Sequence, residues 1–406
     1  MFEKWECHTL VVGGGLAGLA CALTLQDAGV DWLLIEKNDT VGGRVRTHTT
    51  EDGFLIDRGF QVLNTAYPAL HRWIDLQELQ LGEFASGADV FLKGKFHRVG
   101  DPLRNPSDLF PTLAAPVASL KDKINILRLV WFCSKPQNFH AVDKMTTEEF
   151  LLHFGFSHSM IERFFRPFFG GIFLEEELLT SAGKFVTLFS YFSRGRAALP
   201  ARGMQALPEL MASKLPPERL KLGAAGESLK EGAVFTESSQ IKATNVVLAG
   251  WDVQHRLLQQ PLPETHSAYT VSFARPRSPE RGKSYLKLNG SPKGVVQTVA
   301  VNSAAQPSYA PADFDLMAVS TRREASVGQI KEELMAWFGP AVKEWTHLRT
   351  DHIQHALPQE WASFSPQLVQ SIQGVKVLCC GDHTETGSIQ GALTSGRKAA
   401  LAARSS

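Results

Sequence analysis

The first forty residues alternate short apolar runs with one helical repeat. Residues 9–12 and Trp32–Ile35 are apolar runs of the length of a buried strand. Between them, leucine and alanine recur from Leu16 at the three- and four-residue spacing of a helix, up to a stop at Ala28-Gly29. The pattern predicts a strand, a glycine-rich loop, a helix and a second strand.

Later apolar runs continue this alternation. One group of predicted strands covers residues 220–222, 233–236, 246–250 and Val375–Cys380, with helices over 206–215 and from 387 through 400. A second group contains strands at 268–273, 295–301 and 316–320 and a helix at Val327–Phe338, while residues 76–194 are mainly helical by pattern. We therefore predict an α/β fold, α+β overall, with a Rossmann-like domain and a second domain of mixed sheet and helices.

Composition narrows the class of protein. The chain has 406 residues, which suits two or three domains, and its net charge of +1 supplies no field that would attract nucleic acid. The longest apolar runs are about ten residues, and a membrane-spanning helix needs roughly 20. The five scattered cysteines suit a reducing compartment, and no signal-peptide pattern is present. We expect a cytoplasmic protein, with peripheral membrane contact and oligomeric state left open.

The loop after the first strand has the chemistry of a dinucleotide-binding turn. Gly13 would permit the tight turn, Gly15 would let the backbone approach a pyrophosphate, and Gly18 would let the helix pack close to the strand. The free N–H groups of the helix N-terminus favour phosphate. Glu36, about 20 positions beyond the loop, would accept hydrogen bonds from a ribose. The predicted contacts here also include Leu16, Ala17 and Lys37.

A second glycine pair follows the second strand. Gly42 and Gly43 would allow another close backbone approach to the pyrophosphate, with Arg44 as its charge partner. With these residues in place, the sequence resembles the superfamily of flavin-containing amine oxidases, protoporphyrinogen oxidases and phytoene desaturases. The resemblance implies noncovalently bound FAD, and an oxidoreductase in which the flavin accepts hydride at N5 from an organic substrate.

Three later segments carry the same resemblance. Residues 54–62 resemble the strand and turn that pass beside the flavin, and residues 199–204 resemble the turn where the chain re-enters the FAD domain. Residues 377–392 resemble the C-terminal FAD motif. The resemblance implies cofactor contacts from Gly59, Phe60, Gln61 and Val62, and from Gly381, Asp382, Ser388, Ile389, Gln390 and Ala392.

The family layout implies an FAD domain assembled from separated segments. We place it at residues 1–75, 195–260 and 365–406, and place the substrate domain at 76–194 and 261–364. Strands near 222–229 would pass the adenine. Seven phenylalanines between Phe154 and Phe173 indicate either a helical core, the more common case, or an apolar substrate channel. Arg163 and Arg166 lie among them, and surface exposure is expected for both.

Two differences from the amine oxidases of this superfamily bear on the substrate. Many amine oxidases of the superfamily keep a lysine near flavin N5, and the best matching strand here, residues 267–273, has none. The same enzymes often place an aromatic residue at the position held here by Ser388. These departures favour dehydrogenation of a small, lipophilic compound over simple amine oxidation, and no catalytic acid or base can be assigned. The alternative is a flavin-binding protein without net redox turnover, an isomerase or a noncatalytic binding module.

Other chemistries lack a motif in the sequence. No zinc-binding pattern is present, so no metal is expected. No nucleophile elbow is present, so acyl-transfer chemistry has no support.

Overall fold

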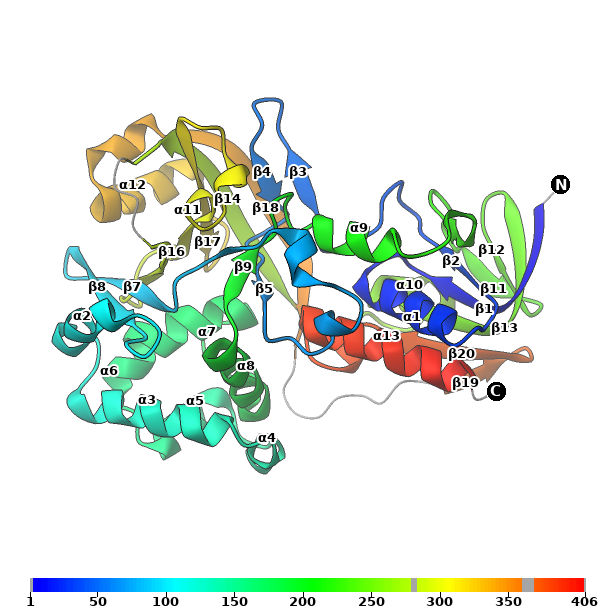
Figure 1. Ribbon diagram of the computed structural model, residues 1–406, viewed down its shortest axis with the longest axis horizontal. Helices are drawn as coiled ribbons and strands as arrows, with labels where there is room; N and C mark the ends of the chain where they lie inside the picture. The colour runs from blue at the N-terminus through cyan, green and yellow to red at the C-terminus, as the bar shows by residue number, and fades with distance from the viewer. Residues whose placement is uncertain (1–2, 279–282, 360–368, 405–406) are drawn as a thin grey trace.

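Two large sheets organise the chain. The computed structural model describes residues 3–278, 283–359 and 369–404. Within that part of the chain, one sheet has eight strands and the other has seven, and each sheet combines segments distant in sequence. Figure 1 shows the eight-stranded sheet at one end of the molecule and the seven-stranded sheet with a layer of helices at the other. The predicted α/β class with a Rossmann-like unit is confirmed, and the assignment of residues to two domains stays a proposal.

The eight-stranded sheet has a parallel centre. Its central strands run in the order β2 (Trp32–Ile35), β1 (Glu3–Val12), β13 (Ser239–Ala249) and β20 (Val375–Cys380). The remaining strands are β10 (Leu220–Lys221) beside β2, β12 (Ala233–Phe235) and β11 (Ser228–Lys230) beside β13, and β19 (Val369–Ile372) beside β20. Because parallel strands point the same way, their four carboxyl ends meet at one edge.

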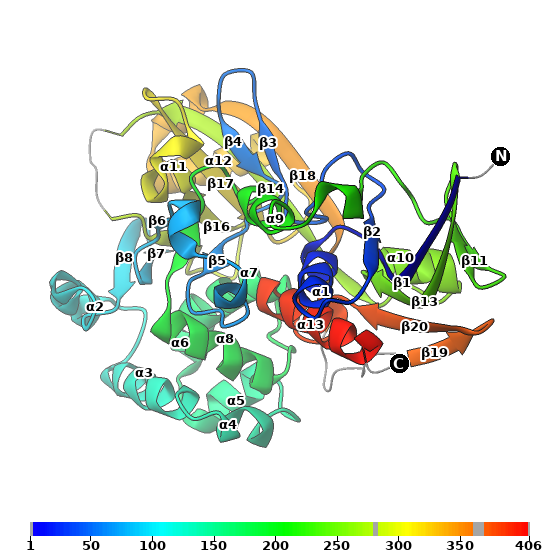
Figure 2. The ribbon, with the colours of Figure 1, turned by 45° about the vertical axis from the view of Figure 1, so that its right-hand side comes forward.

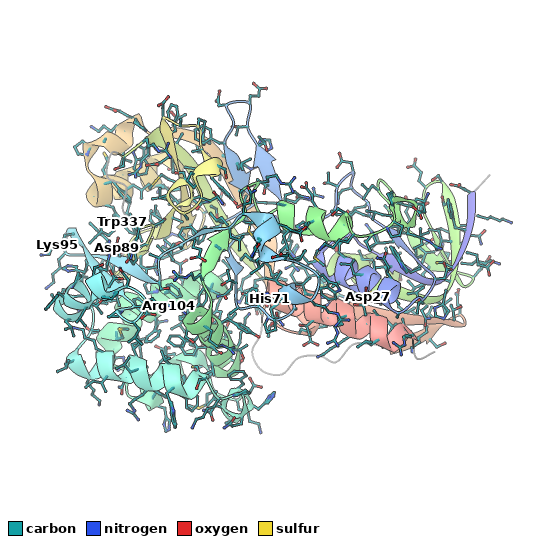
Figure 3. All side chains as sticks on the ribbon, in the orientation of Figure 1. Asp27, His71, Asp89, Lys95, Arg104 and Trp337 are labelled. Carbon is teal, nitrogen blue, oxygen red and sulfur yellow. The ribbon has the colours of Figure 1, made fainter. Side chains whose placement is uncertain are left out.

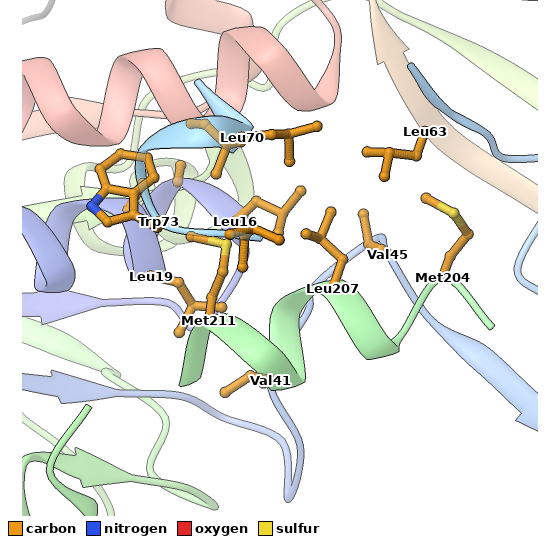
Figure 4. Close-up of a cluster of buried hydrophobic side chains, with 14 of the residues drawn as sticks. Leu16, Leu19, Val41, Val45, Leu63, Leu70, Trp73, Met204, Leu207 and Met211 are labelled. Atoms are coloured by element: carbon orange, nitrogen blue, oxygen red, sulfur yellow. The ribbon is translucent and has the colours of Figure 1, made fainter. Parts of the chain in front are cut away.

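Helices α1 (Leu16–Asp27), α9 (Ala206–Ala212) and α13 (Ile389–Arg404) share one core with this sheet. Helix α10 (Trp251–Leu258) packs into a second core with the same strands. Helices α1 and α13 lie side by side (Figures 1 and 2). They touch through their backbones, because a Cβ at Gly396 would collide with the carbonyl oxygen of Ala17. Figure 4 shows the core beneath them, in which Leu16 and Leu19 of α1 meet Leu207 and Met211 of α9.

The seven-stranded sheet runs in the order β18-β14-β17-β16-β15-β7-β8. Its strands are β7 (Gly87–Leu92), β8 (Lys95–Gly100), β14 (Thr265–Pro276), β15 (Leu286–Asn289), β16 (Val296–Val301), β17 (Phe314–Thr321) and β18 (Thr346–Pro358). Helix α12 (Val327–Phe338) has the predicted bounds and buries Ile330, Leu334 and Trp337 in the core of this sheet. The hairpin of β7 and β8 lies inside the segment that the pattern described as mainly helical.

A layer of helices lies below this sheet in Figure 1. Its members are α2 (Leu109–Ala114), α3 (Leu120–Cys133), α4 (Gln137–Ala141), α5 (Thr147–Phe154), α6 (His158–Met160), α7 (Arg166–Phe173) and α8 (Ala182–Arg194). Phe165, Phe169, Phe173 and Phe185 are fully buried here, so these phenylalanines form a helical core. The expected exposure of Arg166 was wrong, because its side chain is 14% exposed and bonds Glu148 and Glu162.

Short elements join the two halves. They are β3 (Thr47–Thr49), β4 (Leu55–Asp57), β5 (Leu63–Asn64), β6 (Gly82–Glu83), β9 (Ala197–Leu199) and α11 (Asn302–Ala305). The chain leading from α8 into β9 is fastened by Arg104, which donates to the carbonyl oxygens of Ser193 and Gly195. Figure 3 places Arg104 in the same half as Asp89 and Trp337, away from Asp27 at the end of α1.

Two predicted helix boundaries were wrong. Helix α9 ends at Ala212, three residues before the expected end, because Pro216 and Pro217 follow and the residue before a proline avoids the helical region. Helix α13 begins at Ile389 and not at 387. Ser388 stands before it as a cap, since its Oγ accepts a hydrogen bond from the backbone N–H of Gly391 at 3.0 Å.

Candidate functional site

The carboxyl ends of four parallel strands converge on the candidate site. Gly13 follows β1, Glu36 follows β2, Gly250 follows β13, and Gly381 follows β20. Neighbouring ends are joined by hydrogen bonds from the Gly13 N–H to the Ile35 carbonyl and from the Gly250 N–H to the Cys380 carbonyl, each 2.8 Å. Ligands of open α/β sheets bind at this edge.

Gly13 and Gly18 leave no room for a side chain, as predicted for the tight turn and the close packing of helix on strand. Gly13 has φ +114°, and a Cβ at Gly18 would collide with the Gly13 carbonyl oxygen, so helix and strand meet backbone to backbone. Gly15 differs, because a Cβ there would meet only the Cα of Gly43, at 4.0 Å. The space beside Gly15 is therefore open within the described protein, which suits a bound group.

Glu36 is buried at the end of β2 and already holds the loop. One carboxylate oxygen accepts the backbone N–H of Gly14 at 2.6 Å, and the other accepts the backbone N–H of Asn38 at 3.0 Å as well as its side-chain amide. A carboxylate offers about four lone-pair positions. Glu36 thus keeps acceptor capacity for a ribose while it shapes the turn.

The second glycine pair lies against the first loop. The Gly42 N–H donates to the Gly14 carbonyl at 2.9 Å, and Gly43, with φ +62°, faces Gly15. The two loop backbones are thus in contact, without intervening side chains. Main-chain N–H groups brought together in this way can bind a pyrophosphate.

Arg44 crosses from this loop to the C-terminal motif. It donates to the buried carboxylate of Asp382 and, at 3.0 Å, to the Ala356 carbonyl of β18. Its guanidinium also lies 4.3 Å from the ring centre of Trp251, the first residue of α10. Trp251 was not predicted, although its place directly after the strand-ending Gly250 was a usable signal.

His383, next to Asp382, is a second residue that the sequence reasoning missed. Its Nε2 lies 3.0 Å from the side-chain oxygen of Gln254, while the buried Nδ1 has no hydrogen-bond partner within the described protein. Burial lowers the pKa of His383, so the ring is neutral at pH 7. An unpartnered buried nitrogen beside Asp382 marks a place where a bound group would complete the hydrogen bonding.

The remaining predicted residues make protein contacts that support these loops. Lys37 forms an exposed ion pair of 2.9 Å with Asp252, and Gln61 donates to the carbonyl oxygens of Arg44 and Arg58. Gln390 accepts the backbone N–H of Ala69, and Phe60 contacts Phe84 edge to face. Leu16 and Ala17 are buried in α1, whereas Val62, Ile389 and Ala392 are partly buried against the same core.

Gly59 and Phe60 stand where the two sheets approach each other. A Cβ at Gly59 would lie 3.0 Å from Ile353 of β18 and 4.0 Å from the hydroxyl of Thr270 in β14. Below them, Asp57 is buried and accepts hydrogen bonds from Thr47, Met204 and Tyr309. Burial raises the pKa of Asp57 to about 6. This carboxyl ties β4 to the re-entry turn and to the second half of the molecule.

A cavity opens beside Phe60 on the face of the seven-stranded sheet. Its walls come from β14, β16 and β17 and from the turn after α7, through residues 267–270, Gln297, 320–322, Gly171 and 174–176. None of these lining residues is a lysine. The strand without a lysine that the sequence singled out thus forms part of a cavity next to the segment predicted to pass the flavin.

Metal chemistry has no candidate within the described ranges. No group of three or more His, Cys, Asp or Glu side chains there is placed to hold a metal ion. The helices in those same ranges are all too short or too polar to cross a bilayer.

Solved structures with the same fold are known. Wild-type putrescine oxidase bound to putrescine superposes with a TM-score of 0.71 over 100% of both chains at 18% identity. A putative protoporphyrinogen oxidase from Exiguobacterium sp. 255-15 superposes with 0.69 over 99% of both chains at 17% identity. At these identities the likeness shows the fold alone.

Sequence comparison identifies the family. The L-amino-acid oxidase of Bothrops pauloensis is 30% identical over 162 residues, 36% of this chain and 32% of that one, so the chain matches about a third of its length. For the oxidase of Gloydius blomhoffii the identity is 32% over 106 residues, 25% of this chain and 21% of the other. The model of the flavin containing amine oxidoreductases matches residues 16–268. The chain therefore belongs to the flavin-containing amine oxidoreductase family, whose cofactor, FAD, is the one that the sequence predicted.

Proposed function

We propose that the chain is an FAD-dependent oxidoreductase whose organic substrate binds in the cavity beside Phe60. The observation that carries this proposal is the joint placement of two features. The glycine loops, Glu36 and the Arg44–Asp382 pair gather at the strand ends, and Phe60, from the segment 59–62, lines the cavity. Bound FAD supplies the redox chemistry by accepting hydride at N5, and the protein binds and orients the reactants.

We propose that different site residues bind different parts of FAD. Gly13, Gly15, Gly18 and the Gly42–Gly43 turn would lie along the pyrophosphate, and Glu36 would hold the adenosine ribose. Asp382 would meet the ribityl end. The N-terminus of α13, which Ser388 caps, would face the flavin ring, and its partial positive charge would favour negative charge there. Open space beside Gly15 and the unpartnered His383 Nδ1 support this division.

We propose a substrate with an apolar body and one polar end. Phe60, Leu174 and Tyr269 give the cavity apolar surface, while Thr270 and Gln297 offer hydrogen bonds. Two of the charged lining groups are engaged in the wall, since Glu175 accepts the Thr180 N–H at 2.8 Å and Glu176 lies 3.8 Å from Arg322. The absence of lysine from this lining supports oxidation of a compound other than a simple amine.

Anaerobic reduction of the bound flavin tests this function. We expect a substrate from a panel of lipophilic amines, amino acids and partly saturated apolar compounds to bleach the visible flavin absorbance, and air to restore it. The rival function, a flavoprotein without net turnover, predicts no bleaching by any compound although dithionite still reduces the flavin. A protein that cannot be loaded with FAD would contradict both functions.

A further inference from the structure

The helices α2 and α3 carry an unusual amount of apolar surface. The described residues include fourteen exposed large hydrophobic side chains, and nine of them fall between Leu103 and Trp131. Phe110 is 78% exposed, Leu120 67% and Trp131 63%. Single exposed apolar side chains are normal, but a concentration of them in one short segment indicates an interaction surface.

In α3 the apolar residues form a stripe on the outer face. Leu120, Ile124, Leu127 and Trp131 recur every three or four residues, so they share one side of the helix, and all four are exposed. The opposite side, with Leu129 and Cys133, is buried in the helical core. The helix is thus apolar both toward the protein and toward the outside.

Helix α2 carries further exposed apolar side chains. None of its residues is buried, and Leu109, Phe110 and Leu113 are exposed. Lys123 of α3 donates to the Leu113 carbonyl at 2.6 Å, which joins the end of α2 to the first turn of α3. In Figures 1 and 2 both helices lie at the end of the molecule farthest from the cofactor-binding sheet.

The face is held rigidly from the inside. Ser119 and Asp122 form a reciprocal cap at the start of α3, and Asp122 also accepts the backbone N–H and the hydroxyl of Ser157. Asn125 donates to the Gly155 carbonyl one turn later. The outer stripe therefore does not depend on a partner for its shape.

The charges around the stripe have one sign. Between positions 109 and 141 the charged residues are Lys121, Asp122, Lys123, Arg128 and Lys135, and the single acid among them, Asp122, is buried. On a helix with 100° per residue, Lys121 and Arg128 flank one side of the stripe and Lys123 flanks the other. Lys135 lies 3.4 Å above the ring centre of Trp131. The surface is apolar along its middle and basic along its edges.

We propose that α2 and α3 form a docking surface for an anionic lipid bilayer. The stripe would enter the boundary between headgroups and acyl chains, and the basic side chains would reach the lipid phosphates. A second copy of the chain fits less well, because a symmetric contact of this face with itself would bring basic edge against basic edge. This inference concerns where the protein sits and does not rest on the reaction proposed above.

Co-sedimentation of the FAD-loaded full chain with vesicles tests the proposal. We expect binding to vesicles that contain phosphatidylglycerol and weaker binding to phosphatidylcholine alone, with added salt reducing the difference. Ile124→Gln with Leu127→Gln should weaken binding about tenfold or more. Lys121→Gln and Arg128→Gln should each cost about fivefold, only on the anionic vesicles. The matched control is Leu262→Gln with Leu401→Gln, two exposed leucines elsewhere, which should bind like wild type.

Trp131 provides a measure of insertion. Lipids brominated on their acyl chains should quench part of the tryptophan fluorescence of the wild type, and Trp131→Phe should lose that part. Absence of wild-type binding to anionic vesicles, or unchanged binding after the double substitution on α3, would overturn the proposal. So would sedimentation of lipid-free wild type as a dimer that the same double substitution dissociates, if no vesicle binding accompanies it.

Discussion

Arg44 and Asp382 lie 338 positions apart and form an ion pair at the edge of the eight-stranded sheet. Asp382 is buried, whereas Arg44 is partly exposed and also touches Trp251 and β18. The pair directly joins the loop after β2 to the segment after β20. Arg44 also links both to β18 of the seven-stranded sheet.

A double-mutant cycle on this pair should reveal coupling. Arg44→Met leaves the buried carboxylate without its charged partner, and Asp382→Ala leaves the guanidinium without its counter-charge, so each should lower FAD affinity and stability. The double variant should lose less than the sum, with a coupling of about 0.5–3 kcal/mol in thermal or denaturant unfolding. Strict additivity would show that the contact has no energetic weight.

Gly15 and Gly18 should respond differently to alanine. Gly18→Ala should impair folding, because the new methyl group would meet the backbone of Gly13. Gly15→Ala should leave the unfolding of the apoprotein unchanged, since its methyl group enters open space, yet weaken FAD at least about tenfold, or 1.4 kcal/mol.

The control for this pair is Gly328→Ala in α12, where the added methyl group meets only the hydroxyl of Ser326 at 3.8 Å. FAD titration by fluorescence and circular dichroism of the apoproteins provide the two measurements. If Gly15→Ala binds FAD normally, the pyrophosphate does not bind at this loop.

Glu36→Ala should release FAD more readily than wild type. The substitution removes the proposed ribose acceptor and also leaves the buried N–H of Gly14 without its partner. We expect about tenfold or greater loss of affinity, and a smaller loss for Glu36→Gln, which keeps one acceptor oxygen. Flavin released during gel filtration, read by fluorescence, measures both. Equal retention by all three proteins would show that the ribose is held elsewhere.

Ala268→Trp should separate cofactor binding from substrate oxidation. Position 268 lines the cavity in β14, and an indole there would occupy substrate space. The variant should keep its FAD and its melting temperature, while anaerobic flavin reduction by substrate slows at least about tenfold, or 1.4 kcal/mol. Reduction at the wild-type rate would place the substrate in another cavity.

Asp57 should make stability depend on pH. Its pKa is about 6 in the folded protein against about 3.9 in an unfolded chain, so the folded state holds the proton more tightly. The free energy of unfolding should therefore fall as pH rises from about 4 to 6, by roughly 3 kcal/mol through this group.

Asp57→Asn should remove that slope, because the amide accepts from Thr47 and Met204 without titrating. Asp52→Asn, an exposed position on the same hairpin, is the matched control and should keep the wild-type slope. Denaturant unfolding at several pH values provides the measurement. Parallel curves for wild type and Asp57→Asn would contradict the assignment.

The local sequence was sufficient to predict the structure wherever a unit lies within one strand, loop and helix. The unit from β1 through α1 to Glu36 follows from its apolar spacing and glycine positions, because the strand, the loop and the helix are consecutive and Glu36 bonds the loop itself. Helix α12 has a clear cap at Ser326 and an uninterrupted apolar face, and its predicted bounds are those observed.

Only the tertiary structure decided how distant segments meet. Trp251, His383 and Ala356 approach Arg44 because separate strands end at, or cross near, one edge, and no local pattern encodes that meeting. The cavity likewise depends on strand order in the second sheet. The apolar stripe of α3 reads as a core helix in sequence, since spacing alone does not tell which face is buried. The sequence determined the family and its cofactor, whereas the fold determined which segments surround the glycine loop and which apolar surface remains outside.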